Sequence, residues 1–527
     1  MSLQPAAAAR DARQIPVQAF RQILLWPVLL EYTGYAADTD DTPHQGQLDA
    51  WIKCLSAKGW RERELLPPGG PITPMRSGND ATFEEVVYFH PFIRDFYYGD
   101  GAETPADRVL RRLVRDDIAY CDLHLESPHS PPSFRFRVPR VELYLCKPLV
   151  AMLVIELVWD EPVHRAIEGK ESRVDSGRQP DLSLADVLRI QRRVRQVYPP
   201  FFRDAGQAGH CPERIAFRGE REGLPDQVVV ESNFERARPH WAGQTQQGAE
   251  PPVAWHWLKL LEPLKPFLRR GESQRTFRQI VDDRIPSMVY LSVDDPRSIS
   301  PGDMDRLVWC EDPGRGPYPY ANEFLAVDRA RHVYDRYWST DRDNDRPDEL
   351  ELTTRYLCSG FHFVALGRHG NWFFDTLILD HWRRHYLRIG MLAHFHRAAL
   401  LKFADEMGEA VKLLKGLSPR HELDSAAFLS RVQALQMTYL KFLARVWFSE
   451  VSNQLQGQEL FRWWSGMLGN DRLFQEVDVI NDEIHSVMTN RYNQRLSENA
   501  MMWTVGGWVV AVISALLALA GLLKQGS

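Results

Sequence analysis

Residues 473–523 decide the architecture of this chain and read LFQEVDVINDEIHSVMTNRYNQRLSENAMMWTVGGWVVAVISALLALAGLL. The first half repeats apolar residues at spacings of 4, 3, 4 and 3, which is the seam of a heptad repeat. No proline or glycine interrupts residues 473–505, so we expect one continuous helix that runs from a stalk into the apolar second half. The seam residues are Leu473, Val477, Ile480, Ile484 and Val487.

The seam has two explanations. It packs against another helical segment of this chain, at residues 426–455, or it packs against a second copy as a coiled coil. The second explanation predicts a homo-oligomer.

The second half of the stretch has the character of a membrane span. Residues 499–523 carry no charge, and residues 503–523 would form a helix roughly 31 Å long, the thickness of a bilayer's hydrocarbon core. Two tryptophans stand near one end, where indole rings favour the headgroup level. We therefore expect the lipid bilayer as a partner. The residues that mark this span are Trp503, Trp508, Ser514 and Leu523.

The charges around the apolar stretch predict its orientation. Arg491 and Arg495 precede it and only Lys524 follows it, so the positive-inside rule assigns the preceding residues to the cytoplasm. The N-terminus, MSLQPAAAARDARQIPVQAF, has charges and a proline where a signal peptide needs an apolar segment. We expect a tail-anchored, single-pass membrane protein whose N-terminal bulk is cytoplasmic.

The composition fits a globular cytoplasmic part. Hydrophobic residues make up 44% and charged residues 25% of 527 residues, and a net charge of −6 argues against nucleic acid as a partner. The 6 cysteines include no Cys-x-x-Cys pair, which favours reduced thiols over a disulfide framework or a zinc site.

The first 375 residues mix strand and helix patterns. Residues 85–98 are rich in β-branched and aromatic residues and favour an edge strand or turn, and a Pro-, Gly- and charge-rich insertion covers about 199–252. Strand-like runs occur at residues 22–32, 134–138, 150–159, 288–293, 306–310 and 357–366, and helical periodicity occurs at residues 47–58, 107–117 and 184–197.

Residues beyond about 375 are almost entirely helical in pattern. The expected fold class is therefore α+β. We expect a mixed-sheet cytoplasmic domain at residues 1–375, a helical stalk at 376–498 and a transmembrane anchor at 499–527.

His381 and His385 are the metal candidates. Their spacing of four on a predicted helix puts both imidazoles on one face, which makes a divalent cation the cofactor to consider. The run HWRRHY lacks the glutamate of the His-Glu-x-x-His motif. A solvated helix face beside Arg383 and Arg384 is the alternative.

Two groups of arginines form predicted basic helix faces. Such faces suit an anionic ligand or anionic lipid headgroups, and the alternative is a solvated face balanced by neighbouring acids. The arginines are Arg111, Arg112 and Arg115 in the first group and Arg189, Arg192, Arg193 and Arg195 in the second.

Catalytic signatures are missing from the sequence. It has no GxxxxGK[ST] phosphate loop, no GxGxxG after a strand and no GxSxG elbow. We therefore do not expect an enzyme, and an enzyme with an unrecognised site that acts near the membrane is the third alternative.

The architecture resembles the CorA-type divalent-cation transporters, in which a cytoplasmic α/β domain precedes helices and one very long helix that enters the bilayer. The local similarity is greatest at residues 477–519, where Arg491, Asn493 and Arg495 precede the apolar stretch as a polar Arg–Asn segment does in that family. The family's Gly-Met-Asn signature would fall near residues 520–523 and is absent, and we expect no second span.

Two functions follow as hypotheses. The resemblance implies a CorA-like oligomer that serves as a degenerate ion-transport or membrane-effector protein. The alternative is a tail-anchored sensor or interaction protein without transport activity, in which the span serves only as a tether.

Overall fold

The structure is a computed structural model that describes residues 11–32, 43–66, 82–100, 102, 104, 107–125, 133–147, 150–159, 182–198, 211–221, 224–233, 253–266, 275–340, 352–416 and 422–525. The chain divides into two compact units. The first unit comprises residues 1–399 with 441–470, and the second comprises residues 400–440 with 471–527.

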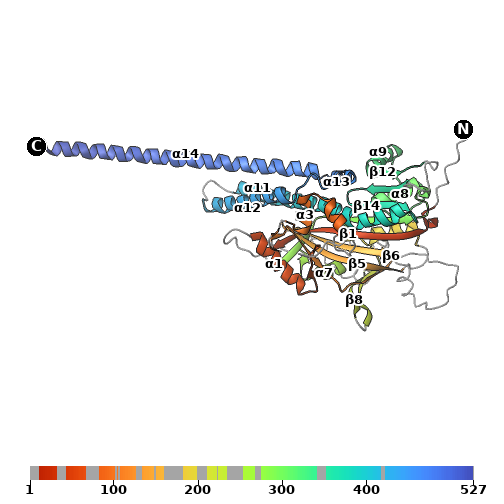
Figure 1. Ribbon diagram of the computed structural model, residues 1–527. Helices are drawn as coiled ribbons and strands as arrows, with labels where there is room; N and C mark the ends of the chain where they lie inside the picture. The colour runs from red at the N-terminus through yellow and green to blue at the C-terminus, as the bar shows by residue number, and fades with distance from the viewer. Residues whose placement is uncertain are drawn as a thin grey trace. The chain divides into compact units, whose positions relative to one another are not determined.

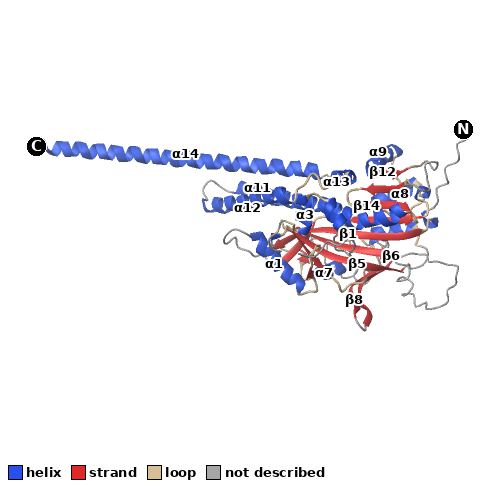
Figure 2. Cartoon of the chain, in the orientation of Figure 1, coloured by secondary structure: helices blue, strands red, loops and turns tan. Residues whose placement is uncertain are grey.

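A mixed, 14-stranded sheet forms the centre of the first unit (Figure 1, Figure 2). Its main path runs β12-β13-β14-β11-β1-β6-β5-β4-β7-β8, with β10 and β9 beside β1 and with β3 and β2 beside β5. The pairs β11–β14 and β9–β10 are parallel and the other pairs are antiparallel. The strands are β1 (Val17–Tyr32), β2 (Arg61–Glu62), β3 (Leu110–Val114), β4 (Tyr120–His124), β5 (Ser133–Cys146), β6 (Val150–Trp159), β7 (Arg214–Arg221), β8 (Leu224–Asn233), β9 (Lys265–Pro266), β10 (Arg275–Gln279), β11 (Ser287–Val293), β12 (Val333–Trp338), β13 (Thr353–Cys358) and β14 (His362–Arg368).

Strand β1 contains a proline, and the sheet accommodates it. On one side, β1 pairs with β6, where Pro27 lies opposite Met152. On the other side, β11 pairs with residues 17–24 and β10 with residues 28–32. Pro27 falls between these two neighbours, so on that side its missing N–H removes no ladder hydrogen bond. The strand predicted at residues 22–32 is confirmed and begins earlier than expected.

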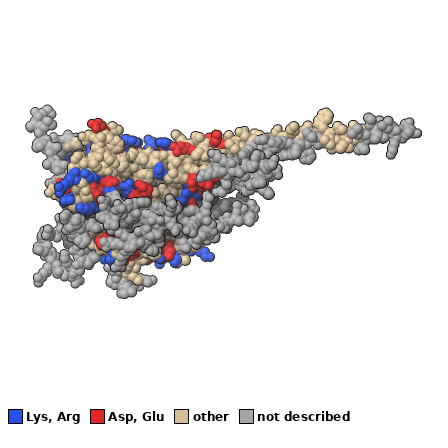
Figure 3. Space-filling view, turned by 180° about the vertical axis from the view of Figure 1, so that it is seen from behind, with Lys and Arg blue, Asp and Glu red and all other residues tan. Residues whose placement is uncertain are grey.

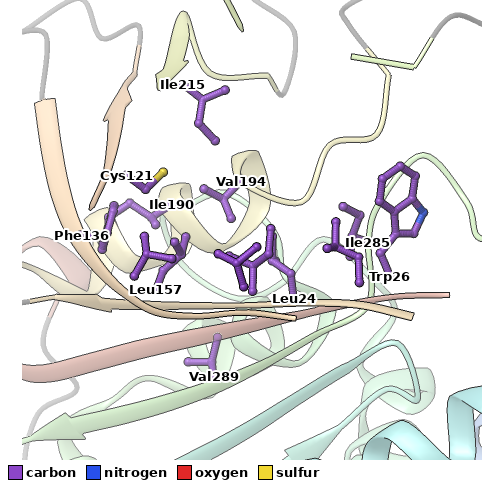
Figure 4. Close-up of a cluster of buried hydrophobic side chains, with 14 of the residues drawn as sticks. Leu24, Trp26, Cys121, Phe136, Leu157, Ile190, Val194, Ile215, Ile285 and Val289 are labelled. Carbon is purple, nitrogen blue, oxygen red and sulfur yellow. The ribbon is translucent and has the colours of Figure 1, made fainter. Parts of the chain in front are cut away.

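One face of the sheet carries the hydrophobic core. Figure 4 shows side chains of strands and helices that meet there, including Leu24, Leu157 and Ile190, all at most 2% exposed. Trp26 packs on Trp257, with ring centroids 5.7 Å apart. Each fully buried aliphatic side chain contributes about 1.5–3 kcal/mol, so this face supplies much of the stability of the unit.

The opposite face of the same strands carries charge. Side chains alternate along a strand, so Leu143 joins the core while Glu142 and Tyr144 point to the other face. Figure 1 shows α3 and α7 on opposite sides of these strands. The central strand predicted at residues 150–159 is β6, whose second face includes the buried Glu156.

Helices cover both faces. The helix α5 begins with a capping box in which Ser183 Oγ accepts from the Asp186 N–H (3.2 Å) and the Asp186 carboxylate accepts from the Ser183 N–H (3.1 Å). Two π-helical turns flank the short α10. The helical elements are η1 (Ala12–Gln14), α1 (Pro43–Ser56), α2 (Phe83–Tyr88), α3 (Pro91–Tyr98), α5 (Leu184–Arg193), α7 (Trp255–Leu261), η3 (Pro296–Ser298), α8 (Pro301–Trp309), α9 (Asn322–His332), η5 (Phe373–Ile378), α10 (Leu379–His381), η6 (Trp382–Tyr386), α11 (Leu387–Gly416), α12 (Glu422–Arg445), α13 (Leu455–Leu468) and α14 (Asn470–Gln525).

Three of the expected elements are wrong. The helix expected at residues 107–117 is the strand β3, because Leu113 pairs with Leu143 of β5 inside the sheet. Residues 85–98 form α2 and α3, since Thr82 caps α2 and Pro91 occupies the first turn of α3. The strand-like run at residues 306–310 lies at the end of α8.

Two other segments contain more strand than expected. The insertion at about 199–252 includes the hairpin β7–β8, which extends the sheet beyond β4. The run at residues 357–366 is the end of one strand and the start of another. Gly360, with φ of +85°, lies in the turn between them.

The second unit contains α14, a single helix of 56 residues. In its seam, Val477 and Ile484 are 0% and 4% exposed, and the other three seam residues are half-buried. The Tyr439 hydroxyl of α12 donates to Asp478 Oδ1 of α14 at 3.4 Å, and Phe403 of α11 packs on the Tyr439 ring. Within this unit, α12 therefore lies beside the seam-bearing part of α14.

The structure places two residues of the expected span on the surface of α14. Trp508 is 70% exposed, and Ser514 is exposed as well. The side chains of Trp503 and Leu523 are not among those that the structure describes. No helix in the described residues has an apolar segment long enough to cross a membrane.

Candidate functional site

A cleft of about 810 Å³ lies in the first unit between α8, α9 and the strands β12 and β13. Figure 1 shows α8, α9 and β12 together at one end of the sheet. A cavity of this size is typical of a small-molecule site. The cleft is lined by Pro296, Arg297, Ile299, Pro301, Met304, Asp305, Val308, Trp309, Asp328, Arg329, Ala330, His332, Val333, Asp335, Trp338, Thr340, Arg355 and Leu357.

The wall formed by α8 is set by signals at its two ends. Ser300 Oγ accepts from the Asp303 N–H at 3.1 Å, and Pro301 follows in the first turn, so the helix begins at that point. Cys310 adopts φ of +55° and ends the helix directly after Trp309. These ends determine which α8 side chains face the cleft.

Two arginines of the cleft are joined to aspartates, and a third, Arg297, donates to the Ser339 and Leu352 carbonyl oxygens at 2.8 and 3.2 Å. Arg329 donates two hydrogen bonds to Asp305, at 2.8 and 2.6 Å, and these bonds raise the pKa of the arginine. Arg355 donates two hydrogen bonds to Asp335, at 2.7 and 2.8 Å. In each pair, the aspartate carboxylate accepts from two N–H groups of the arginine, so both side chains already have partners.

His332 is held by contacts on both ring nitrogens. Its Nδ1 lies 2.7 Å from the Cys358 carbonyl oxygen, and its Nε2 lies 3.1 Å from Asp328 Oδ1. Trp309 meets the imidazole edge-on, with centroids 4.9 Å apart. The ring is therefore fixed in one orientation at the cleft wall.

Trp338 provides a second aromatic surface. The Arg355 guanidinium lies over its ring at 4.1 Å from the centroid, a cation–π distance. The buried indole Nε1 has no hydrogen-bond partner within the described residues.

The metal candidates lie elsewhere in the first unit. The rings of His381 and His385 have centroids 4.6 Å apart, and Tyr88 packs on His385 at 4.2 Å. Burial and then the neighbouring His381 lower the pKa of His385 to about 4, although the charge of Glu85 and the Glu84 backbone oppose the shift. Within the described residues, no three or more His, Cys, Asp or Glu side chains are arranged to hold a metal ion. The pair thus supplies two nitrogens and lies in an aromatic environment.

Six of the seven arginines of the predicted basic faces form ion pairs with acidic residues, whereas Arg195 donates to the Ile285 and Phe361 carbonyl oxygens. Arg111 of β3 bonds to Glu62 and Asp49, and Arg193 bonds to Asp312. Figure 3 shows basic and acidic side chains close together on one face of the molecule. This is the balanced arrangement that was the alternative to an anion site.

A layer of buried charges on the second face of the sheet was missed by the sequence argument. We call it the ion layer. Arg388 of α11 donates to Glu85 (3.0 Å) and to the Tyr144 hydroxyl (2.9 Å), and Tyr144 in turn donates to Glu142 (2.5 Å). The ion layer consists of Arg21, Glu85, Arg112, Arg140, Glu142, Tyr144, Glu156, Arg383 and Arg388.

Electrostatics keep the carboxylates of the ion layer ionised. Burial alone would raise the pKa of Glu142, but Arg112 and Arg140 outweigh burial and lower it to about 2. Burial and arginines compete in the same way at Glu85 and Glu156, and both pKa values are lowered. The sequence signal for this layer was Glu156 in the otherwise apolar β6 and Glu142 in the apolar end of β5, at residues 141–146.

A smaller cavity of about 240 Å³ borders the ion layer. Tyr97, Arg112 and Tyr144 line it together with Arg108 and Arg111. Arg108 bonds to Glu64 at 3.0 Å. The cavity is therefore a weaker candidate for a ligand than the cleft.

No known protein family, curated protein or solved structure matches this chain. The site must accordingly be interpreted from its own chemistry.

Proposed function

We propose that this chain is a membrane-anchored sensor or interaction protein whose cytoplasmic α+β part binds a small molecule in the cleft. The observation that carries this proposal is the cleft itself, with its volume of about 810 Å³, its two tryptophans and its internally paired charges. Catalytic machinery is not part of the proposal.

The anchor of this proposal is the uncharged stretch at residues 499–523. Support comes from the large apolar side chains that α14 exposes there, such as Trp508 at 70% and Val510 at 65%. Isolated exposed apolar residues are ordinary, but a run of them on one helix needs an apolar partner. A bilayer is such a partner.

Membrane retention tests the anchor. An Ala515→Arg variant would place a charge in the middle of the span, at a cost of about 2.5–3.5 kcal/mol on insertion scales. We expect this variant to move from the carbonate-resistant membrane fraction toward the soluble fraction. The matched control is Ala500→Arg, at the start of the uncharged stretch, which should stay in the membrane. Equal retention of both variants would refute the anchor.

A CorA-like oligomer is the second candidate function. The observation that favours it is the continuity of α14, which joins the seam to the apolar stretch in one helix of 56 residues. In this alternative the spans of several chains surround a pore, and a divalent cation is the transported ion, as the resemblance implies. The number of chains in the particle separates the two candidates.

A further inference from the structure

We infer that the cleft takes an uncharged, flat aromatic molecule. The inference deepens the proposed function and rests on its claim that the cleft is a ligand site. It follows from the charge balance of the cleft, its apolar surface and its two tryptophans.

Charge balance excludes ions as the main ligand class. The lining contains three arginines and three aspartates. The Arg329 and Arg355 forks are each occupied by a carboxylate, and Arg297 donates to the Ser339 and Leu352 carbonyl oxygens. A phosphate or carboxylate ligand would therefore have to displace existing hydrogen bonds. A cation would compete with the same arginines, or with His332 at Asp328. An uncharged molecule breaks none of these pairs.

The remaining surface of the cleft is apolar. The side chains of Ile299, Met304, Val308, Val333 and Leu357 all belong to it. Burial of a ligand against this surface yields about 25 cal/mol for each Å² of apolar area removed from water. A largely apolar molecule therefore gains the most free energy in this cavity.

The tryptophans add a preference for aromatic rings. Offset or edge-to-face ring contacts are worth about 0.5–1.5 kcal/mol beyond the area that they bury. Trp309 is held by His332, and Trp338 by Arg355, so both rings are oriented before a ligand arrives. Preorganised rings lose little conformational entropy on binding.

Three naphthalene probes of different charge test the inference: 2-naphthol, naphthalene-2-sulfonate and 2-naphthylmethylammonium. The full chain is reconstituted in lipid nanodiscs, and binding is measured by equilibrium dialysis against empty nanodiscs. We expect saturable binding of 2-naphthol and about tenfold or more weaker binding of both charged probes.

Two matched variants of α9 assign the binding to the cleft. Ala330 is exposed and lines the cleft, so Ala330→Trp fills the mouth without disturbing the core. Ala326 is exposed on the same helix and does not line the cleft. We expect Ala330→Trp to weaken 2-naphthol binding about tenfold or more, and Ala326→Trp to leave it within about twofold.

The exposed carboxylate of Asp335 allows the charge argument to be tested in the opposite direction, by making the cleft more positive. Asp335→Asn frees the Arg355 fork at the surface and gives the lining one extra positive charge. We expect this variant to gain affinity for naphthalene-2-sulfonate by about tenfold, and its failure to do so would contradict the charge argument.

The outcomes separate the ligand class from the site. A charged probe that binds best and is lost in Ala330→Trp would overturn the uncharged class and keep the cleft as the site. If Ala330→Trp changes the binding of none of the probes, both this inference and the sensing role of the cleft are overturned. The membrane anchor is tested separately, by the membrane retention of Ala515→Arg.

Discussion

At the scale of single residues, Glu142 shows how a charge is kept inside a sheet. The side chain is 0% exposed and bonds to Arg112, while Arg140 lies 3.8 Å away. Removing the charge of one partner leaves the buried charges of Arg112 and Arg140 without their counter-ion, which costs about 3–5 kcal/mol. We therefore expect Glu142→Gln to lower the urea midpoint of the first unit strongly.

The control for this prediction is Asp116→Asn. Asp116 is 38% exposed and pairs with Arg61 and Arg63 at the surface. An exposed pair contributes about 1 kcal/mol at most, so this variant should unfold almost like the parent protein. Equal loss in the two variants would mean that burial does not determine the strength of these pairs.

The same carboxylate predicts an acid response. Its pKa is lowered to about 2 in the folded protein, so its contribution to stability is complete above its ordinary value of 4.5. That contribution is lost as the pH falls from 4.5 toward 2, because the unfolded chain then binds the proton more readily. We expect urea midpoints to fall less steeply between pH 4.5 and pH 3 in Glu142→Gln. Parallel slopes in the two proteins would contradict the low pKa.

His385 predicts a second response at milder pH. Burial lowers its pKa to about 4 from an ordinary 6.5, so the folded protein holds the ring neutral. Its contribution to stability is complete above pH 6.5 and is lost between pH 6.5 and pH 4, on the order of 3 kcal/mol in all. His385→Phe preserves an aromatic ring against Tyr88 and removes the titration. We expect its stability to fall less than that of the parent protein over this range, when both are followed by thermal unfolding.

The exposed His485 provides a comparison. The variant His485→Phe should keep the pH dependence of the parent protein. A parallel loss of pH dependence in both variants would show that the buried ring is not responsible.

At the scale of elements, the sequence correctly predicted the segments whose pattern of apolar residues fits only a strand or only a helix. Residues 150–159 are almost uniformly apolar and residues 473–505 lack proline and glycine, and both formed the expected strand and helix. Residues 107–117 failed because their charged side chains suit a helix face equally well. Only the long-range pairing of Leu113 with Leu143 makes them a strand.

The candidate site was hidden for a related reason. The cleft residues all lie within residues 296–357, but they form one cavity only when β12 folds back to pair with β13 beside α8 and α9. The short segment 306–310 resembled a strand, so the helix that carries Trp309 was not expected. Sequence patterns identify the period of an element, but they do not identify the neighbouring element against which its side chains pack.

The seam of α14 makes a prediction at the same scale. Ile484 is 4% exposed, so Ile484→Asp should cost at least the about 2–5 kcal/mol of a truncation to alanine, and it adds a buried charge. Val479 is 67% exposed on the same helix, and Val479→Asp should change stability by about 0.5 kcal/mol or less. Thermal unfolding followed by circular dichroism measures both. Similar loss of stability in both variants would refute the seam.

At the scale of the whole molecule, the number of chains in the particle follows from what covers the seam. The contact between Tyr439 and Asp478 shows that α12 of the same chain lies beside this part of α14. A seam covered in cis leaves less apolar surface for a second copy. The proposed sensor therefore requires no ring of subunits, and we expect a monomer or dimer of the 60.9 kDa chain in detergent.

Light scattering with the detergent contribution subtracted measures this mass directly. A monomer or dimer with one span per chain encloses no pore, so that result would support the tethered sensor and exclude conduction through the spans. A larger discrete ring would instead support the CorA-like oligomer. In that case Ile484→Asp should break the ring into smaller particles, whereas a seam packed in cis would leave the mass unchanged and lower only the unfolding temperature. The particle mass and the unfolding temperature of Ile484→Asp together show whether α12 of the same chain or a second copy covers the seam.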